Sequence, residues 1–251
     1  MHDHHPHPVN EPAETLIRLR GLRYAYPGRS PVIADLDFDL RRDDRIGLVA
    51  PNGSGKTTLF HLIMGLLKPE TGTIEVFGEA VSSEKDFVRV RRKIGLMFQD
   101  ADDQLFSPTV LEDVAFGPLN MGRSKQEAIA VSRKVLSFLG LSAFEDRITF
   151  KLSGGEKKLV SLATVLAMEP EVLLLDEPMN GLDQETRIRL LEVLKSLDMT
   201  YIVISHDIDF LIGATDVIYT MDNGKIIRDE TPHIHQHDHS HLFGNLPHRH
   251  K

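Results

Sequence analysis

Hydrophobic and polar residues alternate along two early segments of the chain, LIRLRGLRYAY (residues 16–26) and VIADLDFDL (residues 32–40). A period of two is typical of a half-exposed strand, and the Pro-Gly pair at 27–28 is a common turn between strands. We therefore expect two antiparallel strands here. A further hairpin is expected to turn at the Asn-Gly pair 223–224.

The middle of the chain has a different pattern, in which short apolar runs alternate with helical spacing. These runs predict buried strands of a parallel sheet covered by helices, an α/β fold. They lie at residues 46–49, 94–98, 172–175 and 201–204. No strand-like run occurs between residues 98 and 172, where apolar spacing predicts helices at 110–119, 125–139 and 155–167. This segment, about residues 100–168, is expected to form a helical subdomain inserted in the sheet domain.

Composition changes this picture little. The 251 residues are 41% hydrophobic and 26% charged, as expected for a globular protein with a proper core. The apolar runs are too short to span a bilayer, so we expect no transmembrane helix and no signal peptide. The absence of cysteine excludes disulfides and thiolate sites and favours a cytoplasmic location. A net charge of −8 argues against a nucleic-acid partner.

The segment LVAPNGSGKTTL, residues 48–59, combines an apolar strand, a glycine-rich turn and a helix start. In such a loop, backbone N–H groups and the helix dipole attract anionic oxygens. The Lys56 ammonium suits β- and γ-phosphates, and the Thr57 hydroxyl suits Mg²⁺. The segment therefore predicts a triphosphate-binding site. The alternative is a glycine-rich turn that binds nothing. Its candidate ATP-binding residues are Asn52, Gly53, Ser54, Gly55, Lys56, Thr57 and Thr58.

One position departs from the phosphate-loop pattern. Ala50 stands five residues before Gly55, where the pattern has glycine. Glycine is needed where φ is positive or where the backbone closely approaches a ligand. We therefore predict a negative φ at Ala50.

Two acids follow the apolar run at residues 172–175. They would lie at the carboxyl end of a buried parallel strand, where ligands bind in open α/β sheets. Asp176 could then hold Mg²⁺, commonly through water, and Glu177 could polarise a water for attack on a γ-phosphate. The alternative is that both acids merely end a strand in solvent.

The segment LSGGE, residues 152–156, places a serine and two glycines at a helix start, where a hydroxyl and bare N–H groups can face an anion. An ordinary capped helix is the alternative. Together with the phosphate loop and the acid pair, this segment resembles the signature of ATP-binding-cassette (ABC) ATPases. The resemblance covers about residues 15–230. It implies a P-loop NTPase (RecA-like) parallel sheet core, an antiparallel β subdomain and an inserted α-helical signature subdomain.

The resemblance also implies roles for single residues that follow in the family's order. Tyr26 would stack on adenine, although Tyr24 is a rival and Tyr26 could be simple packing. Gln99 would link Mg²⁺ to the helical subdomain, so that Mg²⁺ is held through Thr57, Gln99 and Asp176. Asp183, in the segment NGLD, would act across a dimer. His206 would contact the γ-phosphate, which makes Glu177, His206 and Gln99 the candidate catalytic residues.

The same family fold implies a head-to-tail homodimer in which the signature of one subunit covers the ATP bound at Lys56 of the other. The signature residues acting in trans would be Ser153, Gly154, Gly155 and Glu156. The family usually has Gln where this chain has Glu156. A carboxylate near a triphosphate is unfavourable unless it is neutralised or turned away. We therefore expect Glu156 to face away from the phosphates.

The sequence QDADDQLFSPTVLEDVAFGPLNMG, residues 99–122, resembles energy-coupling-factor ATPases, in particular those of cobalt and nickel importers, and LAMEPEVLLLDEP fits the same group. The resemblance implies an ATPase at the cytoplasmic face of the membrane, with membrane coupling (T) and substrate-binding (S) subunits. Residues 100–121 would then receive helices of the coupling protein. Leu105, Phe106 and Phe116 could equally belong to the subdomain core.

Histidines gather at both ends of the chain, and we expect residues 1–14 and 231–251 to be mobile tails. Neutral imidazoles suit Ni²⁺ or Co²⁺, although an inert tail is the alternative. A second class of function therefore stays open, a metal-binding storage or chaperone protein with an ATP-gated release step. The possible transition-metal ligands are His2, His4, His5, His7, His233, His235, His237, His239 and His241.

Overall fold

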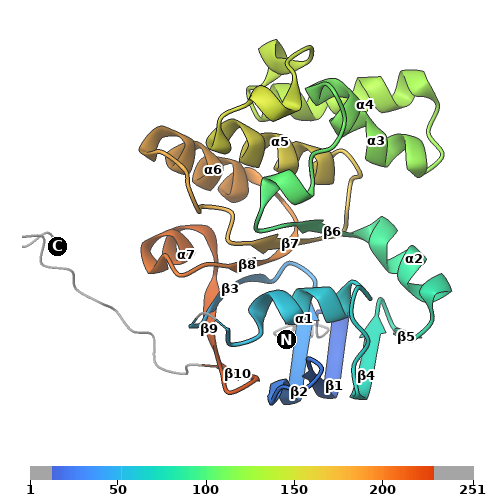
Figure 1. Cartoon of the computed structure of the whole chain (residues 1–251), viewed down its shortest axis with the longest axis vertical. Coiled ribbons are helices and arrows are strands. Elements are labelled where there is room, and N and C mark those ends of the chain that lie inside the picture. Colours follow the sequence, from blue (N-terminus) through green and yellow to red (C-terminus); the bar gives the residue numbers. More distant parts are fainter. Residues whose placement is uncertain (1–12, 52, 229–251) are drawn as a thin grey trace, which may run out of the picture.

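The computed structural model describes residues 13–51 and 53–228, which form two sheets and their covering helices (Figure 1). The smaller sheet is antiparallel, with its strands in the order β2-β1-β4-β5. The predicted hairpin is confirmed, and two further strands, which the sequence analysis did not predict, extend it. The four strands are β1 (Thr15–Ala25), β2 (Pro31–Arg41), β4 (Thr71–Val76) and β5 (Glu79–Val81).

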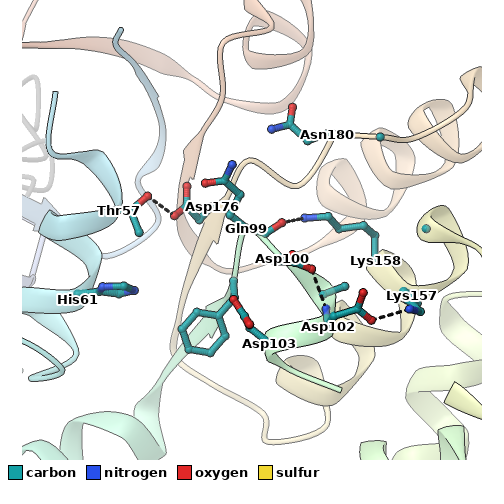
Figure 2. Close-up of a pocket in the computed structure, with 14 residues that line it drawn as sticks. Thr57, His61, Gln99, Asp100, Asp102, Asp103, Lys157, Lys158, Asp176 and Asn180 are labelled. Atoms are coloured by element: carbon teal, nitrogen blue, oxygen red, sulfur yellow. Dashed lines mark hydrogen bonds and ion pairs between the residues drawn. The ribbon is translucent and has the colours of Figure 1, made fainter. Parts of the chain in front are cut away.

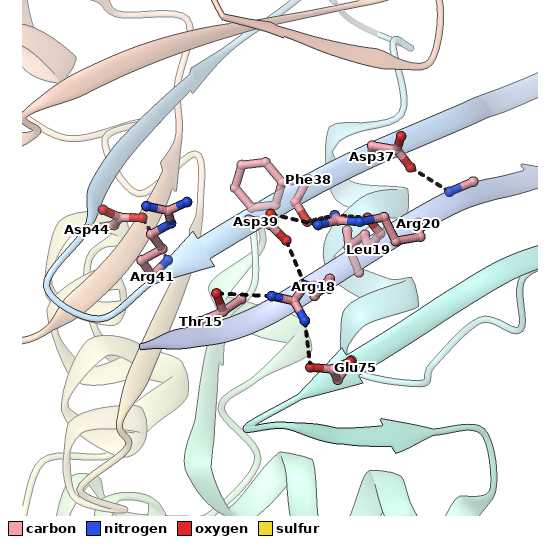
Figure 3. A network of polar contacts seen from close by, with 11 residues as sticks. Thr15, Arg18, Leu19, Arg20, Asp37, Phe38, Asp39, Arg41, Asp44 and Glu75 are labelled. Atoms are coloured by element: carbon pink, nitrogen blue, oxygen red, sulfur yellow. Dashed lines mark hydrogen bonds and ion pairs between the residues drawn. The ribbon is translucent and has the colours of Figure 1, made fainter. Parts of the chain in front are cut away.

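Arginine side chains of β1 link this sheet across its strands (Figure 3). Arg20 donates to Asp39 of β2 at 2.7 Å, and this contact lowers the pKa of Asp39. Arg18 donates to Glu75 of β4 at 3.2 Å. Because these pairs are partly exposed, each adds at most about 1 kcal/mol to stability. Their position on both sides of β1 nevertheless favours the observed register.

The larger sheet has the order β10-β9-β3-β8-β7-β6, and its neighbours are parallel except for the pair β9 and β10. All four predicted apolar runs are strands of this sheet. Asn223 and Gly224 have φ values of 48° and 74°, as a two-residue hairpin turn requires. The strands are β3 (Arg45–Val49), β6 (Ile94–Met97), β7 (Val172–Asp176), β8 (Thr200–Ile204), β9 (Val217–Asp222) and β10 (Lys225–Arg228).

Successive residues of the larger sheet fill two separate hydrophobic cores. In β7, Val172 and Leu174 pack toward the smaller sheet, whereas Leu173 and Leu175 pack toward the helical subdomain. This division follows from the alternation of side chains along a strand. Because both faces are covered, the strands are apolar throughout and their polar residues follow at the strand ends.

Helices α1 (Lys56–Ile63) and α2 (Glu84–Lys93) contribute to the core beside the smaller sheet, and α6 (Gln184–Ser196) and α7 (Ile208–Ala214) to the other core. The predicted helical segment lies between β6 and β7 (Figure 1). Its main helices are α3 (Val110–Asn120), α4 (Lys125–Phe138) and α5 (Gly154–Leu166), with short 3₁₀ turns at Ala101–Asp103, Ser142–Phe144 and Thr149–Lys151.

Side-chain caps fix where these three helices begin. Thr109, Ser124 and Ser153 each cap a helix and form a capping box with a glutamate three residues later. Within residues 13–51 and 53–228, none of the helices combines the length and apolar character needed to cross a bilayer. The predicted domain boundaries and histidine-rich tails stay predictions, because residues 1–12 and 229–251 lie outside the described part.

Candidate nucleotide site

The phosphate loop connects β3 to α1 and owes its shape to its glycines. Gly53 and Gly55 have φ values of 79° and 100°, in the region that favours glycine. A Cβ atom at Gly55 would also lie 2.7 Å from the carbonyl oxygen of Val32 in β2. Ala50 is not among the residues with positive φ, so the prediction for Ala50 is confirmed. Asn52, a predicted ATP-binding residue, lies outside the described residues.

Lys56 is buried within the loop. Its ammonium donates to the carbonyl oxygens of Ala50 at 2.5 Å and of Pro51 at 3.1 Å. A cavity of about 730 Å³ opens beside it, and its wall brings together most of the predicted site. The predicted residues that line this cavity are Tyr26, Gly53, Ser54, Gly55, Lys56, Thr57, Thr58, Gln99, Asp176, Glu177 and His206.

Thr57 and Asp176 meet at the centre of the site, from α1 and the end of β7 (Figure 2). The Thr57 hydroxyl donates to Asp176 Oδ2 at 2.6 Å, whereas Asp176 Oδ1 is buried and has no hydrogen-bond partner among the described residues. Burial raises the pKa of Asp176, and the contact with Thr57 opposes this rise.

This donor set fits the magnesium ion that the resemblance to ABC ATPases implies. A hydroxyl beside an unsatisfied carboxylate oxygen offers the oxygen ligands that Mg²⁺ prefers. Thr57 and Asp176 would hold the ion, directly or through water, and Gln99 lines the same cavity. When bound, Mg²⁺ supplies positive charge against the phosphate oxygens.

Glu177 follows directly after β7 and adopts a φ of 46°, which is unusual for a residue with a side chain. Its N–H donates to the carbonyl of Ile204 at 2.9 Å, which ties it to the end of β8. Its carboxylate lies 3.0 Å from the imidazole Nδ1 of His206. Glu177 is 5% exposed and the side chain of His206 is 66% exposed, so this contact joins a buried acid to an open imidazole.

Tyr26 and its rival Tyr24 have different surroundings. Tyr24 is buried in the core, whereas Tyr26 lines the cavity and its hydroxyl lies 3.1 Å from Thr58 Oγ1. The two rings make an edge contact with centroids 5.1 Å apart. Of the two aromatic residues, Tyr26 is therefore the one placed to reach a ligand.

A second cavity, of about 710 Å³, lies between α1 and the helical subdomain (Figure 2). Gln99 and Asp176 line it as well as the first cavity, and His61 of α1 faces them from the far wall. Burial lowers the pKa of His61, and the charge of Asp176 opposes that change.

Two residues that the sequence analysis missed tie the Gln99 segment to α5. The Lys158 ammonium donates to the main-chain carbonyl of Gln99. Gln104 accepts from the N–H of Phe98 at 3.1 Å and donates to α5 at Ser161 and Thr164, both at 2.8 Å. The sequence held one signal for Lys158. It is a charged residue directly before Leu159, within the apolar positions of its helix, which indicates a lysine that is not simply exposed.

The signature residues occupy the start of α5. Ser153 caps this helix, and Glu156 turns back to accept from the Ser153 N–H at 2.8 Å. Arg147 also donates to the Glu156 carboxylate, at 2.9 Å. The contact with Ser153 lowers the pKa of Glu156, assisted by Arg147. The carboxylate thus stays charged and is paired with Arg147. The expectation that it faces away from a partner's phosphates stays a prediction.

None of Ser153, Gly155, Glu156 and Asp183 belongs to the described residues that line the nucleotide cavity of this chain, and Gly154 lines only the second cavity. Asp183 instead caps α6, where its carboxylate accepts from the N–H and hydroxyl of Thr186, both at 2.9 Å. Apart from Gly154, which shares the second cavity with Thr57, one copy of the chain therefore keeps these predicted site residues away from the phosphate loop.

Comparison with known proteins identifies the family. The ABC transporter family matches residues 33–180. A putative ABC transporter ATP-binding protein of Nitratidesulfovibrio vulgaris is 48% identical over 94% of this chain and 86% of its own length. The energy-coupling factor transporter ATP-binding protein EcfA of Methanothermobacter thermautotrophicus is 42% identical over 86% of this chain and 71% of its own length.

Solved structures of ABC proteins also match this chain. The cbiO1 protein from Clostridium perfringens, part of the ABC transporter complex cbiONQ, matches with a TM-score of 0.76 and 34% identity, over 85% of this chain and 87% of its own. A dimeric ATP-binding cassette in a post-hydrolysis state, bound to ADP and phosphate, matches with a TM-score of 0.77 and 25% identity, over 85% and 97%. The fold, the cavity and these relatives together make the chain a member of the ABC transporter family and an ATPase.

Proposed function

We propose that this chain is the ATP-hydrolysing subunit of an energy-coupling-factor importer that takes up cobalt or nickel ions, and that it works at the cytoplasmic face of the membrane. The observation that carries the proposal is the 42% identity to an EcfA protein over 86% of the chain, together with the nucleotide cavity. The likeness to cbiO1, part of cbiONQ, supports the same class.

At the site itself, we assign ATP binding to Tyr26 and the phosphate loop. Lys56 would neutralise phosphate charge, and Glu177 would polarise the attacking water. His206 is within hydrogen-bond distance of Glu177 and would orient it or the γ-phosphate. The buried, strained position of Glu177 supports its assignment, because such backbone geometry concentrates at active sites.

A second copy of the chain would complete the site. The signature residues do not line the nucleotide cavity of their own subunit, yet they present a serine hydroxyl and helix N–H groups suited to an anion. A head-to-tail homodimer would bring them over a partner's ATP. A dimeric cassette among the solved relatives supports this arrangement.

The membrane coupling subunit would contact the helical subdomain. Phe106 and Phe116 are 64% and 46% exposed and lie edge to face with centroids 4.7 Å apart, whereas Leu105 packs against the subdomain core. Exposed aromatic pairs are enriched where proteins associate. Of the three candidates, the two phenylalanines are therefore the ones available to a partner.

Cobalt or nickel is proposed from the resemblance of residues 99–122 and from the terminal histidines. Among the residues described, no group of three or more His, Asp or Glu side chains is placed to hold a metal ion. Any transition-metal site of this chain is therefore proposed on the tails. Calorimetry with Ni²⁺ should give stronger binding to the full chain than to a version lacking residues 1–14 and 231–251. Equal binding by both would remove the tails from this role.

Uptake in cells tests the function directly. Cells that express the chain with its membrane subunits should accumulate Co²⁺ or Ni²⁺, and the same cells carrying Glu177→Gln should not. The chain should also copurify with a coupling subunit. Metal binding without uptake or copurification would favour the storage or chaperone alternative instead.

A further inference from the structure

We propose that Lys158 is a positioning residue that holds the main chain of Gln99 and Glu177 in the geometry needed for ATP hydrolysis. The proposal rests on the roles proposed for those two residues. Lys158 lies on α5, five residues after the serine that caps this helix, and its side chain reaches toward Gln99 (Figure 2). It is therefore a direct link between the signature helix and the hydrolytic centre of the same subunit.

The surroundings of Lys158 are unusual for a lysine. Its residue is only 6% exposed, and its ammonium donates to the main-chain carbonyl of Gln99 and lies 3.5 Å from that of Glu177. Among the described residues it forms no ion pair. A buried ammonium without a carboxylate partner is costly, so its two carbonyl contacts serve a purpose other than stability alone.

Three acids of the site lie near Lys158. Burial lowers its pKa, whereas the charges of Asp176, Asp100 and Glu177 oppose that change. The ammonium thus stands close to the carboxylates that would meet Mg²⁺ and water. Because its bonds go to carbonyls, these carboxylates stay free for that chemistry.

Glu177 has particular need of such a contact. Its φ of 46° is strained for a residue with a side chain, so neighbouring groups must hold it. The N–H of Glu177 donates to the carbonyl of Ile204. The carbonyl of Glu177 accepts from the N–H of Asn180 at 3.2 Å and faces the ammonium of Lys158. Removing the Lys158 ammonium would leave the Glu177 carbonyl without its contact to the helical subdomain.

The same ammonium fixes the segment that carries Gln99. Gln104 ties the far end of this segment to α5 through hydrogen bonds of 2.8 Å, and Lys158 ties its beginning. These contacts, together with the more exposed ion pair between Lys157 and Asp102, make the segment follow α5 as a unit. Of the α5 residues that the structure describes, only Lys158 also has a polar contact with Glu177, so a shift of the signature helix would reach both residues together.

Lys158→Met tests this role, because methionine is apolar, nearly as long as lysine and well tolerated in buried positions. We expect kcat for ATP to fall about 10- to 100-fold, as small misplacements of reacting groups do, with KM for ATP changed less than about twofold. The Mg²⁺ concentration for half-maximal rate should rise several-fold, because Gln99 is displaced. The unfolding temperature should stay near that of the wild type.

Lys157→Met is the matched control. Lys157 is the neighbouring lysine on α5, but it pairs with the exposed carboxylate of Asp102 rather than with the main chain. Its kcat and Mg²⁺ requirement should stay within about twofold of the wild type. If Lys158→Met fails to fold, Lys158→Gln is tested instead, with the same expected results. The glutamine side chain is one atom shorter than that of lysine and cannot reach both carbonyls.

The outcomes separate this proposal from the function on which it rests. A kcat of Lys158→Met within twofold of the wild type, or an equal loss in Lys157→Met, would overturn the positioning role while leaving the ATPase intact. A loss that appears only as a higher KM or a lower unfolding temperature would also overturn it. If Glu177→Gln hydrolyses ATP normally, the proposed role of Glu177 fails instead, whatever Lys158 does.

Discussion

The Thr57 hydroxyl donates a 2.6 Å hydrogen bond to Asp176, across 119 positions of the sequence. This contact joins the first turn of α1 to the end of β7. It satisfies one oxygen of a carboxylate that is 3% exposed and leaves the other without a partner among the described residues. An unpaired buried carboxylate oxygen destabilises the fold, and the Mg²⁺ ion proposed for this site would give it a partner.

Asp176→Asn should therefore stabilise the nucleotide-free protein while removing its activity. The folded-state pKa of Asp176 is raised, so the folded form is relatively stable at low pH and loses that advantage as the pH rises through this pKa. The neutral amide avoids that loss. We expect an unfolding temperature about 2–4 °C higher at pH 7 for each kcal/mol gained, a smaller gain at pH 4, and no hydrolysis of Mg-ATP. Scanning calorimetry without nucleotide measures this, with the exposed Asp198→Asn as control; a lower unfolding temperature at pH 7 would contradict it.

Glu177→Gln should stop turnover and leave ATP binding in place. The amide keeps the size of the side chain but cannot accept a proton from water, so we expect kcat to fall by about 10² to 10⁴. ATP-bound dimers should then accumulate, which size-exclusion chromatography with and without ATP can detect. Undiminished hydrolysis would remove Glu177 from its proposed role.

Glu156→Ala should lower stability in a pH-dependent way. Hydrogen bonding from Ser153 lowers the folded-state pKa of Glu156, so its contribution is fully present above the unfolded value near 4.3 and is lost as the pH falls through the folded value. We expect the variant to unfold at lower temperature than the wild type at pH 7, with a difference that shrinks below about pH 4. A constant difference across this range would contradict a charge-dependent cap.

Glu156→Gln provides the matched substitution. Glutamine can still accept from the Ser153 N–H and loses only the ion pair with Arg147, which is partly exposed and worth at most about 1 kcal/mol. Its ATPase rate should stay within about twofold of the wild type. A many-fold increase would mean that the carboxylate of Glu156 does act on the phosphates.

Phe106→Ser combined with Phe116→Ser should weaken association with a membrane coupling subunit. Both rings are exposed, so the double variant should keep its unfolding temperature and its ATPase rate as a separate protein. Copurification with the coupling subunit should fall several-fold. Phe138→Ser, which changes an exposed phenylalanine at the end of α4, is the control and should copurify normally. Equal retention of both variants would contradict a docking role for the aromatic pair.

The sequence predicted the main elements because their signals are local and strong. Each of the four apolar runs is a strand of the larger sheet, and the helices between residues 98 and 172 lie close to the predicted bounds. Strands β4 and β5 were missed. In β4 only Ile74 and Val76 are buried, and β5 is a three-residue edge strand, so neither shows a sustained alternation.

The part of the site that could be predicted consists of side chains at the ends of parallel strands, which meet at one edge of the sheet. Thr57, Asp176 and His206 lie at or just after the carboxyl ends of three different strands and gather around one cavity for that reason. Lys158 and Gln104 escaped prediction because most of their hydrogen bonds go to main-chain atoms, and no residue type marks a main-chain atom as a partner. Their roles depend on how α5 packs, which local patterns do not encode.

The contact between Gly55 and Val32 makes the nucleotide loop depend on the antiparallel sheet. The Val32 carbonyl lies where any side chain at Gly55 would have to go, and the side chains of Ile33 and Met221 crowd the same spot. A defect in β2 would therefore appear first as poor nucleotide binding, with the loop sequence itself intact. A genetic screen for loss of ATP binding should accordingly recover substitutions in β2, outside the phosphate loop.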